Sequence, residues 1–262
     1  MSRGVFITVY LFISTAICAV TPRAAAQAPL SIEQLIMDAS RWQLTAGIDE
    51  RSAHQPVGEL RDLGLRTSLR YGITAKLEVN AGVSQRRTDR RVPGDFGRDR
   101  TQIISMGSTW LLHSEGRWPA LLTEARWDLF LPSARETDRS AGGVFAATVY
   151  RSIDPVVLSL RASVHRRSAF ADNGRKVTPG PSWRVEPMVN FAVNPRVTLL
   201  TGLTFSRHAA TRLDGGRLLA PRHDLGLRLG IGLAPTPGSN LFLSGDIGSA
   251  AVGIGLEWFF EL

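Results

Sequence analysis

The last eleven residues of the chain alternate strictly between two kinds of side chain. On one face of an extended strand fall Val252, Ile254, Leu256, Trp258, Phe260 and Leu262, and on the other Gly253, Gly255, Glu257, Phe259 and Glu261. A water-soluble protein turns such an apolar row towards its core. An outer-membrane barrel turns it towards lipid and leaves small or polar residues to the lumen. A strand of this kind therefore restricts the chain to few architectures.

Eleven further segments repeat the alternation, each near the 9–11 residues that a tilted strand needs to cross a bilayer. They cover about 42–48, 63–71, 77–83, 104–112, 121–131, 144–151, 158–164, 183–193, 197–205, 225–233 and 241–247. Segment 144–151 is apolar on both faces, so its phase is ambiguous, and Pro187 interrupts another segment. The pattern predicts an all-β chain of about twelve strands.

The connections differ in length in a regular way. Tight turns are expected at 71–74, 153–155, 194–196 and 235–238, and long polar loops at 51–62, 85–100, 132–142, 166–182 and 207–222. Short periplasmic turns and long outer loops are typical of bacterial barrels. A soluble β-sandwich explains the alternation but not this asymmetry. We therefore predict an antiparallel transmembrane β-barrel, which occupies residues 42–262.

The N-terminus predicts export. Residues 1–26 combine Arg3, the apolar stretch 5–20 and a small-residue cleavage site before Gln27, which is typical of a cleaved signal peptide. The single cysteine lies within this signal, so the mature chain has no thiol chemistry. Residues 27–41 are expected to form a periplasmic segment with a short helix from Ser31 to about Ala39, or a small plug at the barrel mouth. The predicted location is the outer membrane of a Gram-negative bacterium.

Charged residues occupy the strand faces opposite the apolar rows. The lumen-lining candidates are Arg66, Arg70, Glu78, Glu124, Arg126, Asp128, Arg161, His165, Arg184, Glu186, Asp224, Arg228 and Glu257. Two interpretations stay open for them. They form cross-strand ion pairs that brace the wall, or they form a constriction whose fixed charges sort permeating solutes.

The net charge of +8 arises largely in the expected outer loops. Arginine binds phosphate through bidentate hydrogen bonds, so basic outer loops suit the phosphates of lipopolysaccharide. The candidates are Arg86, Arg87, Arg90, Arg91, Arg166, Arg167, Arg175 and Lys176. The alternative is a set of solvated loops without a fixed partner. Nucleic acid is not expected as a partner of an exported chain.

Catalytic patterns are sparse. Ser163 and His165 share a strand face, and His223 adjoins Asp224, but neither pair lies in the surroundings of a hydrolase motif. Metal-ligand spacings and glycine-rich phosphate loops are absent from the sequence. We expect neither an enzyme nor a cofactor.

Two motifs carry resemblances to known proteins. Residues 70–74 (RYGIT) and 76–79 (KLEV) resemble a recurring periplasmic hairpin of the transporter-like proteins named for the meta pathway of phenol degradation, with Ala75 in place of the usual acid. That family includes the export channel of a functional amyloid system. Gly255, Trp258 and Phe260 resemble the C-terminal signal read by the outer-membrane assembly machinery, although the chain closes on Leu262 rather than an aromatic residue.

The family resemblance implies a barrel of about twelve strands that acts as a channel for small organic or peptide-like solutes. We expect passive diffusion through a polar lumen. The alternative is a non-conducting structural or surface-interaction barrel that binds lipopolysaccharide or a partner through its basic loops. The expected partners are outer-membrane lipid, lipopolysaccharide, the assembly machinery and a small solute of unknown identity.

Overall fold

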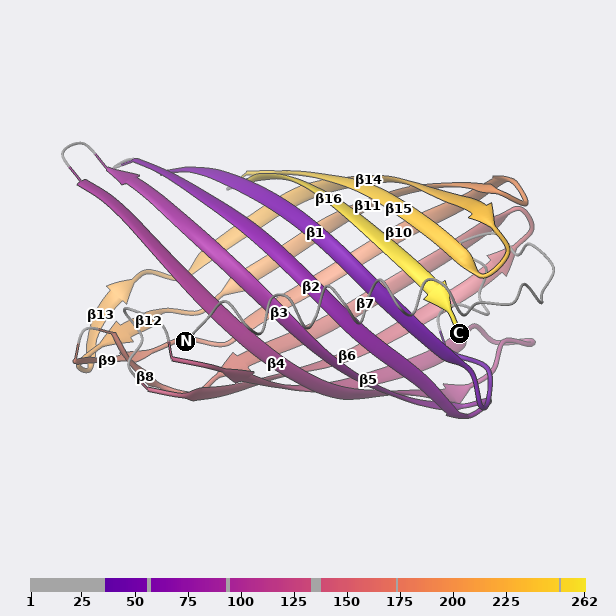
Figure 1. The fold of residues 1–262 in the computed structure, drawn as a ribbon, viewed down its shortest axis with the longest axis horizontal. Coiled ribbons are helices and arrows are strands. Elements are labelled where there is room, and N and C mark those ends of the chain that lie inside the picture. Colours follow the sequence, from indigo (N-terminus) through magenta and orange to yellow (C-terminus); the bar gives the residue numbers. More distant parts are fainter. Residues whose placement is uncertain (1–35, 56–57, 93–94, 133–137, 173, 250) are drawn as a thin grey trace.

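The computed structural model describes residues 36–55, 58–92, 95–132, 138–172, 174–249 and 251–262. Twelve strands form a closed barrel in the order β1-β16-β15-β14-β11-β10-β7-β6-β5-β4-β3-β2 (Figure 1). Every neighbouring pair in the barrel is antiparallel, and β1 closes it against β16 through pairs such as Gln43↔Glu261. The predicted barrel and its number of strands are confirmed.

The barrel strands are tilted and mostly longer than the sequence pattern suggested. Their bounds are β1 (Trp42–Gln55), β2 (Gly58–Thr74), β3 (Leu77–Val92), β4 (Asp95–His113), β5 (Ala120–Phe130), β6 (Ser140–Ile153), β7 (Val156–Arg167), β10 (Ser182–Asn194), β11 (Val197–His208), β14 (Arg222–Thr236), β15 (Ser239–Gly248) and β16 (Val252–Glu261). We call the end with the C-terminus and the short turns the periplasmic end, and the opposite end the outer end, as in bacterial barrels.

The alternation of side chains explains why the wall is stable in lipid. Large apolar residues such as Met106, Trp110 and Phe145 project outwards and are 56–58% exposed in the isolated chain. Because each strand pairs on both sides, the backbone hydrogen bonds of the wall are made within the protein, as a bilayer requires. In β6, Val144 and Tyr150 face inwards and are buried, so this strand is apolar on both faces. Its ambiguous phase has that cause.

Two of the predicted outer loops are instead strand. Residues 51–62 and 85–100 extend β1 to β4, which join at the outer end across 56–57 and 93–94. Arginines and carboxylates on adjacent strands pair there, and the Thr88 hydroxyl donates to Asp62 Oδ1 at 2.6 Å. Such cross-strand pairs stabilise a polar ladder that has no apolar alternation. The loop prediction was wrong because it relied on apolar residues alone.

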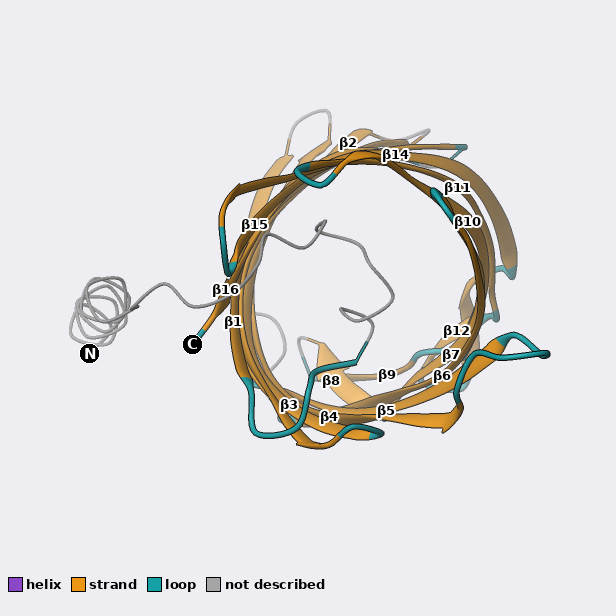
Figure 2. Cartoon of the chain, turned by 90° about the vertical axis from the view of Figure 1, so that its right-hand side faces the viewer, coloured by secondary structure: helices purple, strands orange, loops and turns teal. Residues whose placement is uncertain are grey.

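Two other long links also contain strands. Residues 166–182 include β8 (Phe170–Asp172) and β9 (Arg175–Thr178), and residues 207–222 include β12 (Thr211–Leu213) and β13 (Gly216–Leu219). These four strands form a separate sheet in the order β13-β12-β9-β8, at the outer end. In the view along the barrel, β8 and β9 fall inside the outline of the wall (Figure 2).

The predicted N-terminal helix is not found where the structure can be described. Residues 36–41 form bends and a turn, and Ser40 has a φ of 62°. The Ser40 N–H donates to the Gly72 carbonyl, and the Gly72 N–H donates to the Arg41 carbonyl. These hydrogen bonds fix the segment to β2 and compete with helical pairing. The predicted signal peptide, residues 1–26, and helix residues 31–35 lie outside the described residues. No helix in the described part is long and apolar enough to span a bilayer.

Candidate functional site: the inner wall of the barrel

The strand register places all thirteen lumen-lining candidates on the face opposite the exposed apolar residues. Arg66 and Arg70 lie on β2, Glu78 on β3, Glu124, Arg126 and Asp128 on β5, Arg161 and His165 on β7, Arg184 and Glu186 on β10, Asp224 and Arg228 on β14, and Glu257 on β16. The structure brings most of them together in ion pairs. Their part in solute passage stays a proposal.

The first group lies at the periplasmic mouth. Arg70 donates to both carboxylate oxygens of Glu78, from Nε at 3.0 Å and from Nη2 at 2.6 Å, and to Gln43 Oε1 from Nη1 at 2.9 Å. Glu78 Oε2 also accepts the backbone N–H of Met37 at 2.9 Å. The Glu78 side chain is only 2% exposed. The group is therefore dry, fully hydrogen-bonded and attached to the N-terminal segment.

The second group lies further along the bore, around its middle. Arg66 pairs with Glu257 across β1, and Arg161 Nη2 contacts Glu124 Oε2 at 2.7 Å. Both pairs are partly exposed, and the Arg66 side chain is 47% exposed. Arginines and carboxylates thus alternate around the bore without an excess of either sign.

The same part of the bore holds two further arginines. Arg126 Nε contacts Asp128 Oδ1 at 3.0 Å on its own strand. Arg228 Nε contacts Asp246 Oδ1 at 2.7 Å, and its Nη1 lies 3.7 Å from Glu186 Oε1. Asp246 was missed by the sequence analysis, because β15 shows its alternation only at Leu241, Leu243 and Ile247.

Inward glycines decide how these side chains lie. A Cβ at Gly47 would come within 2.9 Å of Arg66 Nε, and one at Gly230 within 2.5 Å of a Phe242 ring carbon. Long side chains therefore lie flat over glycines of the neighbouring strands. They follow the wall and do not cross the bore.

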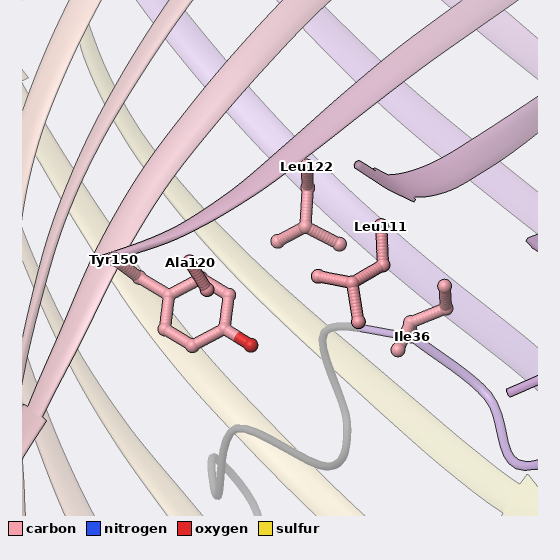
Figure 3. Close-up of a cluster of buried hydrophobic side chains, with 5 residues drawn as sticks. All are labelled: Ile36, Leu111, Ala120, Leu122 and Tyr150. Carbon is pink, nitrogen blue, oxygen red and sulfur yellow. The ribbon is translucent and has the colours of Figure 1, made fainter. Parts of the chain in front are cut away.

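The inner wall also has an apolar patch, formed by Leu111, Ala120, Leu122 and Tyr150 near the periplasmic end. Ile36 of the N-terminal segment packs against this patch and is itself 9% exposed (Figure 3). The neighbouring Met37 is also buried. Residues 36 and 37 thus join the apolar patch to the charged group around Glu78. This agrees with a small plug, one of the two forms expected for residues 27–41, but the structure describes only its last six residues.

The remaining inner-wall candidates lie towards the outer end. Asp224 Oδ2 is 3.3 Å from both His208 Nε2 and Arg222 Nε. His165 lies opposite Ser182, and Arg184 opposite Ser163. Ser163 and His165 share the inner face as expected, whereas His223 and Asp224 point to opposite faces of β14. In the described ranges, no group of three or more potential metal ligands is found.

The predicted lipopolysaccharide-binding residues do not share one surface. Arg86 and Arg90 lie on the inward-facing register of β3, whereas Arg87, Arg91 and Arg166 lie on outward positions. Several of them already have partners within the chain: Arg87 contacts Asp89 at 2.8 Å, Arg167 donates to Ser140 and stacks on Phe130 and Phe170, and Arg175 and the Lys176 N–H contact Asp214. Binding of lipopolysaccharide by this set stays a prediction.

The predicted assembly signal lies on β16. Trp258 and Phe260 face outwards with ring centroids 4.9 Å apart, and Trp258 Nε1 donates to Ser239 Oγ at 2.6 Å. Gly255 faces inwards, where a Cβ would lie 3.2 Å from Ser244 Oγ. Recognition by the assembly machinery stays a prediction.

Solved structures share this fold at low sequence identity. An outer membrane channel from Pseudomonas putida F1 is 11% identical with a TM-score of 0.69, over 93% of this chain and 100% of that chain. The transport unit of the autotransporter AIDA-I from Escherichia coli is 12% identical with a TM-score of 0.58, over 88% and 91%. The CymD monoaromatic hydrocarbon channel is 9% identical with a TM-score of 0.50, over 85% and 88%. These likenesses show an outer-membrane β-barrel fold.

No protein-family model matches the sequence, and no curated protein matches it either. Membership of the phenol meta-pathway family therefore stays a prediction, although the twelve-strand barrel that the resemblance implies is present.

Proposed function

We propose that the protein is a passive outer-membrane channel for small organic solutes. The observation that carries this proposal is the arrangement of the inner charges. Arg66 and Phe242 lie flat over Gly47 and Gly230, so these side chains line the bore and do not fill it. A barrel of this size is narrow enough for inward side chains to close it. A wall that lays its long side chains sideways favours passage.

The chemistry of the wall favours solutes with both polar and apolar parts. Paired arginines and carboxylates offer hydrogen bonds without a net charge that would repel one sign. The apolar patch around Leu122 and Tyr150 offers contact with a hydrocarbon part on one side. The shared fold with a monoaromatic hydrocarbon channel supports the same substrate class.

The N-terminal residues are part of the proposal. Ile36 and Met37 occupy the periplasmic mouth and are buried there. A solute that leaves the bore on the periplasmic side passes this segment. We therefore expect residues 36 and 37 to reduce the flow through the intact channel.

Planar-bilayer conductance of the refolded mature chain tests the proposal. The matched variant lacks residues 27–37 but keeps Asp38 to Arg41, whose hydrogen bonds hold the segment to Gly72. We expect stepwise current from the mature chain and a larger unitary conductance from the truncated one. Equal conductances would keep the channel and remove the plug. Silence from both chains, with heat-modifiable migration showing folded barrels, would overturn the channel and favour a structural barrel.

Liposome swelling then tests the solute class. Proteoliposomes with the truncated chain should admit a small aromatic acid or alcohol faster than a sugar of similar mass. Replacing Leu122 with Ser should reduce this preference, because it removes apolar contact from the inner wall. An unchanged preference would restrict the proposal to a general diffusion pore.

A further inference from the structure

The lipid-facing side of the barrel has a groove near the outer end, on β10, β11 and β14. Its volume is about 390 Å³, and its main lining residues are Trp183, Val185, Phe205, Arg207, His223 and Leu225. All six side chains belong to the outward-facing register of their strands. The groove is therefore separate from the bore and from the channel proposed above.

The strand register places the lining residues in two rows. Trp183, Arg207 and His223 lie side by side in the upper row, and Val185, Phe205 and Leu225 lie in the row below. Further rows below are mainly apolar and continue down to Val197 and Leu233 at the periplasmic end. The outward apolar band of such barrels is roughly 25 Å tall. Arg207 and His223 thus stand at its upper boundary, where lipid headgroups meet the protein.

Neither basic residue of the upper row has a partner in the described part of the chain. Arg207 and His223 are both exposed and make no hydrogen bond or ion pair there. The adjacent Asp224 belongs to the inner face, where His208 and Arg222 contact its carboxylate. No carboxylate of this part of the wall therefore neutralises the two basic groups.

The opposite side of the same rim shows how the chain treats its other outward arginines. Arg61 contacts Glu50 at 2.5 Å, and Asp89 receives both Arg87 and Arg98. Charges on that side are satisfied within the protein. Arg207 and His223 are left for a ligand from outside.

We propose that this groove binds the lipid A part of lipopolysaccharide in the outer leaflet. The Arg207 guanidinium binds a phosphate oxygen pair through two parallel N–H donors, and the His223 imidazole donates to the same phosphate. An acyl chain lies on the floor formed by Val185, Phe205 and Leu225. Trp183 lies beside the sugar, where an indole suits the boundary between lipid and water. Phosphate and acyl chain belong to one molecule, which fits the adjacency of the two rows.

Native mass spectrometry of the refolded mature chain tests this site, with diphosphorylated lipid A as the probe. The variant is Arg207→Gln combined with His223→Gln. The matched control is Arg61→Gln, which removes the same formal charge from the opposite side of the rim. The double variant should bind the probe at least about tenfold more weakly, as expected for loss of a charge-assisted hydrogen bond. The control should bind it like the unchanged chain.

Dephosphorylated lipid A separates the two parts of the groove. We expect the unchanged chain to bind it as weakly as the double variant binds the diphosphorylated probe. Equal binding of both lipids, equal losses in the double variant and the control, or tight binding of phosphatidylglycerol in place of lipid A would each overturn the proposal. Heat-modifiable migration shows that each variant is folded. Conductance is not a readout here, so failure of this site leaves the channel proposal untouched.

Discussion

Arg70–Glu78 and Arg175–Asp214 make the same kind of ion pair at opposite ends of the molecule. Both use an arginine Nε and a carboxylate oxygen, at 3.0 Å and 2.9 Å. Their surroundings differ, because the Glu78 side chain is 2% exposed and that of Asp214 is 49% exposed. A dry pair is costly to break, whereas an exposed pair contributes little. Depth in the structure thus decides what an ion pair does here.

The pairs in the middle of the bore lie between these extremes. Arg228 and Asp246 are each about 30% exposed, so water and solutes reach them. Bracing and solute sorting, the two roles open for the charged residues, therefore separate by position. The periplasmic pair braces the wall, and we assign sorting to the middle pairs. The predictions below follow this order.

Glu78→Gln should have the largest effect on stability. Glu78 accepts three hydrogen bonds, two from Arg70 and one from the Met37 N–H. The variant leaves the Arg70 guanidinium buried without a counter-charge. Breaking a buried pair in this way typically destabilises a protein by about 3–5 kcal/mol. Urea titration of the refolded barrel, followed by tryptophan fluorescence and heat-modifiable migration, measures the change.

Glu124→Gln is the matched control for that experiment. Glu124 also pairs with one arginine, Arg161, but both side chains are partly exposed. Its loss should destabilise the barrel by about 1 kcal/mol or less. Equal losses in the two variants would contradict the ranking by depth.

Gly72→Ala should release the N-terminal segment. A Cβ at this position would overlap the carbonyl oxygen of Asp38, which is backbone and has no room to rotate away. The mature chain lacks cysteine, so Ile36→Cys provides a single label site. Maleimide should react slowly with this buried thiol in the parent and faster in the Gly72→Ala background. We expect a difference of at least about tenfold, the factor for about 1.4 kcal/mol of lost docking.

Gly82→Ala is the control for the label experiment. Gly82 also faces inwards on a neighbouring strand, but the closest contacts of its Cβ, near 3.0 Å, come from the wall and not from the N-terminal segment. Labelling of Ile36→Cys should stay slow in this background. Fast labelling in both would mean that general loosening of the wall, not contact with Asp38, holds the segment.

The barrel was predictable from the sequence because lipid imposes a two-residue period on every spanning strand. The same argument found Arg66, Arg228 and Glu257 on the inner face. It did not find the strand extensions 51–62 and 85–100, since these stand beyond the apolar band and are held by pairs such as Thr88–Asp62. Polar ladders leave no apolar pattern to detect.

Contacts between distant segments were also beyond the sequence. Nothing in residues 36–37 indicates that they dock on Glu78 and the apolar patch, 41 residues and more away. The groove at Arg207 and His223 depends on which cations lack a partner, and pairing is decided by register. The helix expected from Ser31 to Ala39 failed, in its described part, for a related reason. Hydrogen bonds to Gly72 replace the helical ones, and they appear only once β2 is in place.

Arg228→Gln should change ion selectivity with little effect on stability. It leaves Asp246, and Glu186 nearby, without their cation in the middle of the bore. The reversal potential in a KCl gradient should move towards cation preference. Asp246→Asn should move it the other way. A shift of up to about fivefold in permeability ratio is expected, since unit charges 4 Å apart in water interact by about 1 kcal/mol. Shifts of the same sign in both variants would remove these residues from the sorting role.

Acid should affect the outer sheet alone, and this is the smallest expected effect. The hydrogen bond from Arg175 and that from the Lys176 N–H lower the pKa of Asp214 below its ordinary value of 3.8. The pairing of β9 with β12 is therefore supported at pH values above 3.8 and loses this support as the pH falls through the lowered pKa. Hydrogen exchange of residues 211–219 should rise between neutral pH and pH 3 after correction for the intrinsic rate, while the barrel strands stay protected. Asp214→Asn should show the loosened sheet at neutral pH and no acid step. An acid step that persists in this variant would place the responsible group elsewhere and end the comparison between the two ends of the molecule.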